Sequence, residues 1–120
     1  MNNRRLGMVW ERKSRLFLKE KFNTSEIFKL INPERIDWVI FYKEIVPRVA
    51  LVESKFTKKE KYYPFENEKK RRQIDEYFKK RDNLRNIGLI CDIYFLIQKG
   101  KKKEIFFEKI EKMEDIKKSY

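Results

Sequence analysis

The tripeptide Glu53-Ser54-Lys55 places an acid and a base two positions apart at the end of the apolar run "PRVALVESKF". Side chains alternate between the two faces of a strand, so Glu53 and Lys55 share one face. A charge on a buried or half-buried face is costly unless it is paired, bound to a ligand or used in a reaction. The pair is therefore the first candidate for chemistry in this chain.

A further acid, Asp37, belongs to the same candidate site. Residues 36–42 and 48–56 are β-rich runs separated by Lys43 to Pro47, a pattern that predicts an antiparallel hairpin. If the turn centres on Ile45, residues whose numbers sum to 90 face each other, and Asp37 lies opposite Glu53. We therefore expect three charged side chains at one end of the hairpin.

Two carboxylates and an amine at this spacing suit phosphodiester hydrolysis. Asp37 and Glu53 offer the oxygen ligands that Mg²⁺ or Mn²⁺ prefers, and such an ion makes water acidic enough to attack phosphorus. Lys55 would orient or deprotonate that water, or neutralise charge in the transition state. The alternative is that both acids end their strands in solvent and Lys55 pairs with one of them.

The constellation Asp37…Glu53-Ser54-Lys55 resembles the PD-(D/E)xK nuclease superfamily, and the layout of residues 4–110 is similar to the archaeal-type Holliday junction resolvases. The G-x-x-x-E-R element of their first helix corresponds here to residues 7–12. The resemblance implies that Asp37 and Glu53 ligate the metal, that Lys55 is catalytic and that Glu11 adds a carboxylate. It also implies a homodimer whose two sites cut opposite strands of a four-way junction.

Three positions qualify the resemblance. Ile36 stands where the superfamily often has proline. Gln73 and Tyr77 look like the Q-x-x-x-Y element of the RecB-like exonuclease branch, with Gln73 near a phosphate; alternatively, Tyr77 is a core residue. Without the resemblance, Glu11 would be an acid on a helix surface paired with Arg15 at i+4.

Composition points to a polyanionic partner. Lys and Arg number 31 against 19 acids, for a net charge of +12, and 15% of residues are aromatic. A folded protein with this excess of positive charge most commonly binds nucleic acid. Three groups are candidates for phosphate contacts: Arg4, Arg5, Arg12 and Arg15; Lys58, Lys59 and Lys61; and Arg71 and Arg72 together with Gln73.

The same composition excludes several kinds of site. One cysteine and no histidine rule out intramolecular disulfides, thiolate or imidazole metal clusters, iron–sulfur clusters held by four cysteines and Cys/His or Ser/His catalytic pairs. No apolar run approaches the length of a membrane span, and no signal-peptide pattern is present. We expect an intracellular protein without a membrane partner.

The remaining patterns predict a single α/β nuclease domain over residues 1–120. Amphipathic helices are expected at 6–21 and 64–85, with proline in the first turn of the second, and strands at 87–97 and 104–110. The order is helix, two strands, helix, two strands (α-β-β-α-β-β), in a restriction endonuclease-like core with a mixed sheet between helices. The last ten residues are expected to be a short helix or a frayed tail.

Three functions remain open from the sequence. The first is a structure-selective endonuclease that uses Mg²⁺ or Mn²⁺ to resolve four-way junctions. The second is another PD-(D/E)xK nuclease, an exonuclease or nickase, and the third is a non-catalytic basic DNA-binding protein. For the homodimer, the aromatic residues Tyr94, Phe95, Phe106 and Phe107 are candidates for the subunit interface, with the protein core as the alternative.

Overall fold

The described chain folds as one mixed sheet with a helix on each face. A computed structural model describes the backbone of residues 3–30, 36–100 and 104–120, and the side chains from residue 8 onward within those ranges. The described residues form a five-stranded sheet in the order β1-β2-β3-β4-β5. Its strands are β1 (Ile27–Lys29), β2 (Trp38–Glu44), β3 (Val46–Thr57), β4 (Cys91–Lys99) and β5 (Glu104–Ile110).

The hairpin has the predicted register. Trp38 pairs with Val52 and Glu44 with Val46, so paired residue numbers sum to 90 and Ile45 alone forms the turn. Ile45 has φ of 68° and is 90% exposed, which is an unusual conformation for a β-branched residue. One step beyond the last pair, the register sets Asp37 opposite Glu53.

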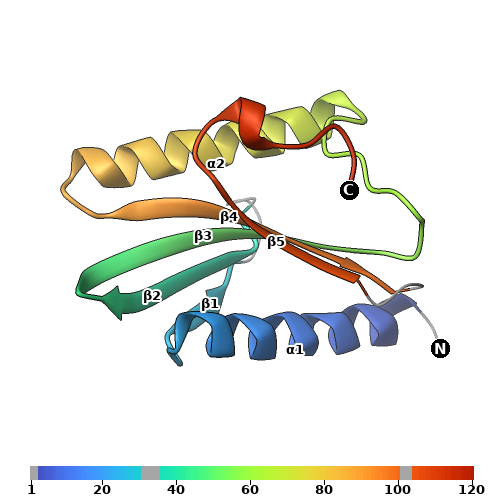
Figure 1. The fold of residues 1–120 in the computed structure, drawn as a ribbon, viewed down its shortest axis with the longest axis horizontal. Coiled ribbons are helices and arrows are strands. Elements are labelled where there is room, and N and C mark those ends of the chain that lie inside the picture. The colour runs from blue at the N-terminus through green and yellow to red at the C-terminus, as the bar shows by residue number, and fades with distance from the viewer. Residues whose placement is uncertain (1–2, 31–35, 101–103) are drawn as a thin grey trace.

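The two helices cover opposite faces of the sheet (Figure 1). In α1 (Asn3–Phe22), Ser14, Leu18 and Phe22 recur every four residues and are buried, as one face of a helix requires. In α2 (Glu68–Asn86), Ile74 and Tyr77 are buried. β3 and β4 run parallel, and α2 is the crossover that parallel neighbours need.

Strand alternation divides the core into two clusters. Leu51 and Phe95 are among the residues that pack beneath α2, whereas Ala50, Val52 and Leu96 pack beneath α1. β4 is buried on both faces, as its nearly continuous apolar sequence predicts. Glu53 and Lys55 therefore follow Leu51 on the α2 face, and Ser54 follows Val52 on the α1 face.

The predicted order of elements lacked one strand. Residues 27–29 form β1, which pairs with β2 at the edge of the sheet, and three residues are too few to show an alternating pattern. The second helix begins at Glu68 rather than near Pro64, because Asn67 is its N-cap and accepts a hydrogen bond of 2.9 Å from the backbone N–H of Lys70. β4 begins at Cys91 rather than residue 87, since Gly88 has φ of 97° and turns the chain first.

The C-terminal residues fold back onto the α2 side of the sheet. They contain the short 3-10 helix η1 (Met113–Asp115), and Tyr120 is 5% exposed. The backbone groups of Tyr120 and Tyr62 exchange two hydrogen bonds of 2.8 Å each. The tail is therefore docked, and its last described residue fixes the loop that follows β3.

The four aromatic residues considered for a subunit interface contribute to packing within the chain, and Tyr94, Phe106 and Phe107 are half-buried. Phe95 is 2% exposed, and Phe106 packs against the same cluster and contacts the Tyr120 ring. Tyr94 and Phe107 stack at 5.2 Å within the cluster beneath α1. In the part of the chain that the structure describes, no helix is both long and apolar enough to span a membrane.

Candidate functional site

Glu53 is a buried carboxylate with side-chain partners on β3 and α2. It is 3% exposed; its Oε1 lies 3.0 Å from Lys55 Nζ, and its Oε2 accepts a hydrogen bond of 3.3 Å from Gln73 Nε2. The ion pair establishes that Glu53 and Lys55 share a face, as strand alternation predicts. The side chain of Lys55 is 30% exposed, so solvent or a ligand can reach its ammonium group.

Glu53 and Asp37 are two acids that lie close together, and the pKa of each is raised. Burial, and next the charge of Asp37, raise the pKa of Glu53 to about 7, against the opposing effect of Lys55. Burial also raises the pKa of Asp37. For Lys55, burial favours the neutral form, but the charges of Glu53 and Asp37 outweigh it and raise the pKa. Lys55 therefore stays protonated at neutral pH.

Asp37 is held at the end of the hairpin by backbone contacts. Its Oδ2 accepts a hydrogen bond of 2.9 Å from the N–H of Ser54, and its carbonyl accepts one of 3.1 Å from the N–H of Leu30. Its own N–H donates to the hydroxyl of Tyr77 at 2.9 Å. One oxygen of the Asp37 carboxylate, Oδ2, is thus held by the backbone of β3.

The helical pair Gln73 and Tyr77 lies directly against these acids. Tyr77 is fully buried, and its hydroxyl donates to the carbonyl of Val52 at 3.1 Å while it accepts from the N–H of Asp37. It is both a core residue and a link between β2 and β3 beside Glu53. Gln73, four residues earlier on the same helical face, donates a hydrogen bond to Glu53.

Glu11 lies on the other side of the sheet and is paired with a residue that the sequence patterns did not indicate. Its Oε2 is 3.0 Å from Lys29 Nζ, on β1, rather than beside Arg15. Glu11, Lys29 and Asp37 line a cavity of about 160 Å³, together with Trp10, Ser14, Trp38, Ser54 and Phe56. We call this cavity the Asp37 cleft. Lys29 was not predicted as a site residue because the strand that carries it, β1, was not predicted.

The structure does not gather the three acids into one group. Among the described residues, no set of three or more Asp, Glu, Cys or His side chains is arranged to hold a metal ion. Asp37 lies between Glu53 on the α2 face and Glu11 in the Asp37 cleft. Asp37 and Glu53 could hold a hard cation between them, and Glu11 would have to leave Lys29 to join them.

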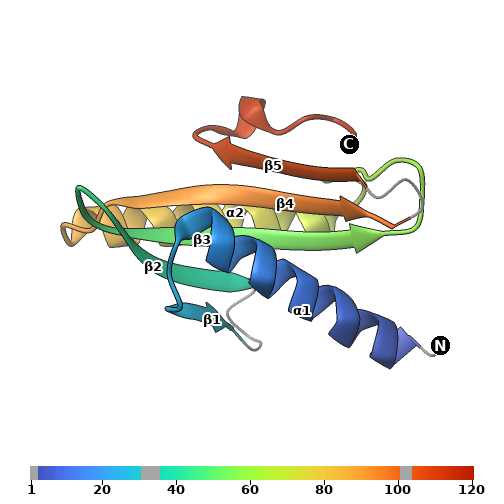
Figure 2. The same ribbon diagram turned by 60° about the horizontal axis from the view of Figure 1, so that its bottom comes forward.

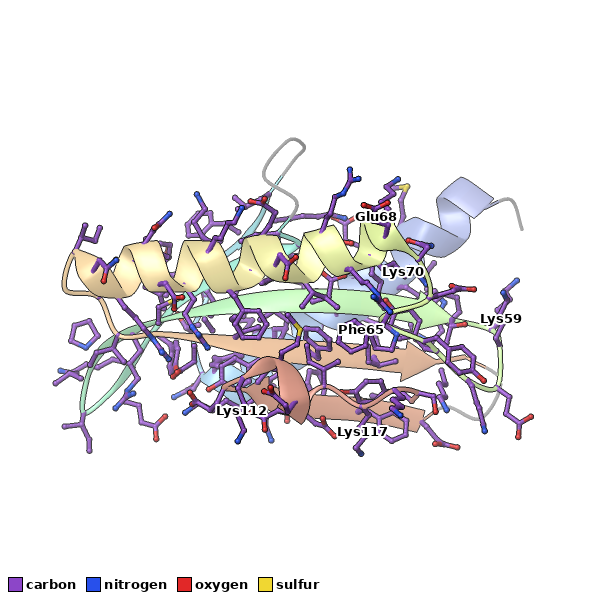
Figure 3. The ribbon with its side chains drawn as sticks, turned by 90° about the horizontal axis from the view of Figure 1, so that it is seen from above. Lys59, Phe65, Glu68, Lys70, Lys112 and Lys117 are labelled. Atoms are coloured by element: carbon purple, nitrogen blue, oxygen red, sulfur yellow. The ribbon has the colours of Figure 1, made fainter. Side chains whose placement is uncertain are left out.

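The predicted basic groups flank the site from both faces of the sheet. Arg12 and Arg15 lie on α1 and Arg71 and Arg72 on α2, on opposite sides of the sheet (Figure 1). Lys58, Lys59 and Lys61 are exposed in the loop after β3, and Figure 3 shows Lys59 at the end of the molecule where α2 begins. The side chains of Arg4 and Arg5 lie outside the described residues.

Two of these arginines already have partners. Arg15 Nη1 donates to the carbonyl of Ile27 at 3.0 Å, and Arg72 Nη2 lies 2.9 Å from Glu68 Oε1. The Arg72 pair is exposed, so it is weak and open to exchange for a phosphate. Arg15 instead joins α1 to β1, a structural role.

A second tyrosine, Tyr62, approaches the site from the loop after β3. Burial, then the charges of Glu53 and Asp37, raise its pKa, and Lys70 Nζ lies 4.7 Å from its ring centroid. Its backbone is tied to Tyr120, so the docked tail positions it. The sequence offered no sign of this contact, since the two residues are far apart in the chain.

No protein-family model matches the chain, and no match was found among curated proteins or solved structures.

Proposed function

We propose that this chain is a metal-dependent endonuclease of the PD-(D/E)xK superfamily that resolves four-way DNA junctions. The observation that carries the proposal is the placement of Asp37 opposite Glu53, with Lys55 Nζ 3.0 Å from the buried Glu53 carboxylate. Buried acids with a raised pKa and a second acid nearby are typical of functional sites. An ion pair with only a structural role would cost less free energy of desolvation at the surface.

The donor set suits Mg²⁺ or Mn²⁺. Asp37 and Glu53 repel each other, and this repulsion contributes to the raised pKa of Glu53. A hard divalent cation held by both carboxylates would relieve the repulsion. When bound, the ion would polarise the phosphate and acidify water. Both carboxylates would then be fully ionised at neutral pH.

Lys55 acts as a fixed positive charge rather than as a base. Its raised pKa keeps the ammonium group protonated, so it cannot accept a proton at neutral pH. Held by Glu53 and partly open to solvent, the ammonium offsets the negative charge that develops on a phosphate during displacement.

The resolution of a four-way junction requires two cuts, and this requirement favours a homodimer. The described part of a single chain carries one such pair of acids, and resolving a junction requires two cuts on strands related by an approximate two-fold axis. A dimer of this chain would present one site to each strand. The net charge of +12 and the basic residues on both sides of the site support DNA as the substrate.

A second reading follows from the contact between Gln73 and Glu53. This contact, from a residue of the Q-x-x-x-Y pattern, supports another nuclease of the same superfamily, an exonuclease or nickase. The non-catalytic alternative, a basic DNA-binding protein, treats the Glu53–Lys55 pair as structural. All three readings predict DNA binding, so only cleavage separates them.

The deciding experiment is cleavage of a four-way junction labelled on each arm, with and without Mg²⁺. We expect paired cuts near the crossover from the wild type and at least a hundredfold slower cutting by Glu53→Gln at equal junction affinity. Glu76→Gln, an exposed acid on α2, is the matched control and should cut normally. Digestion from the ends of the DNA would favour the exonuclease. No cutting with Mg²⁺ or Mn²⁺ would leave only the non-catalytic DNA-binding protein.

A further inference from the structure

A second cavity, larger than the Asp37 cleft, lies on the α1 face between the middle of α1, the end of β4 and the start of β5. Its volume is about 460 Å³, within the range of cavities that bind small organic molecules. Figure 2 shows α1 crossing the sheet diagonally, so that its first turns diverge from β4 and β5. Its lining includes Trp10, Lys13, Leu16, Phe17, Lys99 and Ile105.

The lining combines aromatic and aliphatic surface with positive charge. Trp10 stacks on Phe56 with ring centroids 3.9 Å apart, and Lys13 Nζ lies 4.4 Å from the Trp10 ring centroid. Leu16 is 66% exposed and Ile105 50%, although both face the cavity. Phe56 and Lys13 lie over the two faces of the Trp10 ring, so a flat ligand would cover the exposed Leu16 and Ile105 side chains and reach the ring by displacing the Lys13 ammonium.

Trp10 also belongs to the wall of the Asp37 cleft, so the two cavities adjoin. Between them, Ser14 Oγ donates a hydrogen bond of 2.9 Å to Gln98 Oε1 and lies 3.0 Å from Ser54 Oγ. Gly100 packs so closely on Phe56 that an added Cβ would lie 2.7 Å from its ring. This tightly packed partition fixes the distance from the cavity to Asp37.

We propose that this cavity binds an unpaired nucleobase of the DNA strand whose backbone reaches Asp37. Every base has an apolar face that stacks on aromatic side chains, and a nearby lysine pairs with the adjoining phosphate. Among the described lining residues, Lys13 supplies that charge; Lys99 does not, because its Nζ lies 5.2 Å from the Phe106 ring centroid, in the cluster beneath α2. Such a base is available in a single strand or where a duplex opens, so the cavity would recognise unpaired DNA rather than a sequence.

The inference rests on the proposed function only for the choice of strand, and its test needs no cleavage. Binding of a fluorescein-labelled oligothymidylate of about ten nucleotides would be measured in EDTA, with Leu16→Glu and Ile105→Glu as variants. Ile87→Glu is the matched control, because Ile87 is 75% exposed in the loop between α2 and β4 and the charge change is identical. Thermal unfolding would verify that each variant is folded.

We expect Leu16→Glu and Ile105→Glu each to weaken oligothymidylate binding at least about fivefold more than the control, the lower end of the effect of losing one stacked base. Binding should also quench tryptophan emission, because Trp10 is partly exposed while Trp38 is 2% exposed, and Trp10→Phe should remove the quenching. Equal weakening by all three charged variants, or quenching that persists in Trp10→Phe, would overturn the proposal. Failure to cleave junctions would refute the nuclease but leave this result standing.

Discussion

The N–H of Asp37 donates a hydrogen bond of 2.9 Å to the hydroxyl of Tyr77, which in turn donates to the carbonyl of Val52 at 3.1 Å. One buried hydroxyl on α2 thus joins the start of β2 to the strand that carries Glu53. The separation of the two acids depends on this bridge as well as on the hairpin register. Tyr77 is therefore a positioning residue for the proposed site.

Tyr77→Phe should reduce Mg²⁺-dependent cleavage more than its effect on stability explains. The variant keeps the buried ring but leaves two backbone groups unpaired, at a cost of roughly 1–3 kcal/mol. Tyr120→Phe is the control, since its hydroxyl also has two partners, Glu108 and the N–H of Lys117. Urea denaturation and junction cleavage should show comparable destabilisation but slower cutting only for Tyr77→Phe; equal cutting would contradict a positioning role.

Glu53 should make the wild type less stable as the pH rises from about 5 to 8 in EDTA. Its pKa is about 7 in the folded chain, against 4.5 for an ordinary glutamate, so the folded state binds more protons across that interval. Its contribution to stability is therefore fully present below pH 4.5 and is lost as the pH rises through 7.

Glu53→Gln, which cannot titrate, should lose less stability over the same interval. The difference between the two proteins should grow by up to about 3 kcal/mol, because one pKa unit corresponds to about 1.4 kcal/mol. The measurement is urea denaturation at several pH values, with Glu76→Gln as the exposed control. Parallel pH profiles for wild type and Glu53→Gln would show that Glu53 has an ordinary pKa.

Glu11 should influence the Mg²⁺ requirement through Lys29. The ammonium group of Lys29 lies 3.0 Å from Glu11 and competes with any cation for that carboxylate. Glu11→Gln should raise the Mg²⁺ concentration for half-maximal cleavage severalfold, and Lys29→Gln should lower it. Lys43→Gln, an exposed lysine at the far end of β2, is the control. If neither change moves the Mg²⁺ titration, Glu11 has no part in the site.

The hairpin was predictable from the sequence because its determinants are local. Alternation and a turn at Ile45 specify the register, and the register alone brings Asp37 opposite Glu53. The spacing of Gln73 and Tyr77 predicts that they share a helical face. Only the position of α2 in the structure shows that this face contacts Glu53. Lys29 and Tyr62 were not predictable, since a three-residue edge strand has no periodicity and the pairing of Tyr62 with Tyr120 spans half the chain.

DNA affinity should fall steeply with salt concentration. About six phosphate contacts would give a slope near −5 in a plot of log affinity against log salt. The double variant Lys58→Ala, Lys59→Ala should make the slope shallower by about 2, since each lost contact removes roughly 0.9. Lys43→Ala, Lys118→Ala removes the same charge elsewhere and should change the slope little. A wild-type slope near −1 would show that the excess charge does not contact phosphates.

Two subunits should be needed for resolution but not for nicking. Because each subunit of 15.0 kDa contributes one Glu53, a mixed dimer of wild type and Glu53→Gln retains a single functional site. It should nick one strand of the junction at a normal rate without releasing two duplexes. Sedimentation at micromolar concentration checks the premise and should give about 30 kDa, twice the monomer mass. A stable monomer that makes paired cuts would contradict the two-site arrangement, since one Asp37–Glu53 pair would then be cutting both strands.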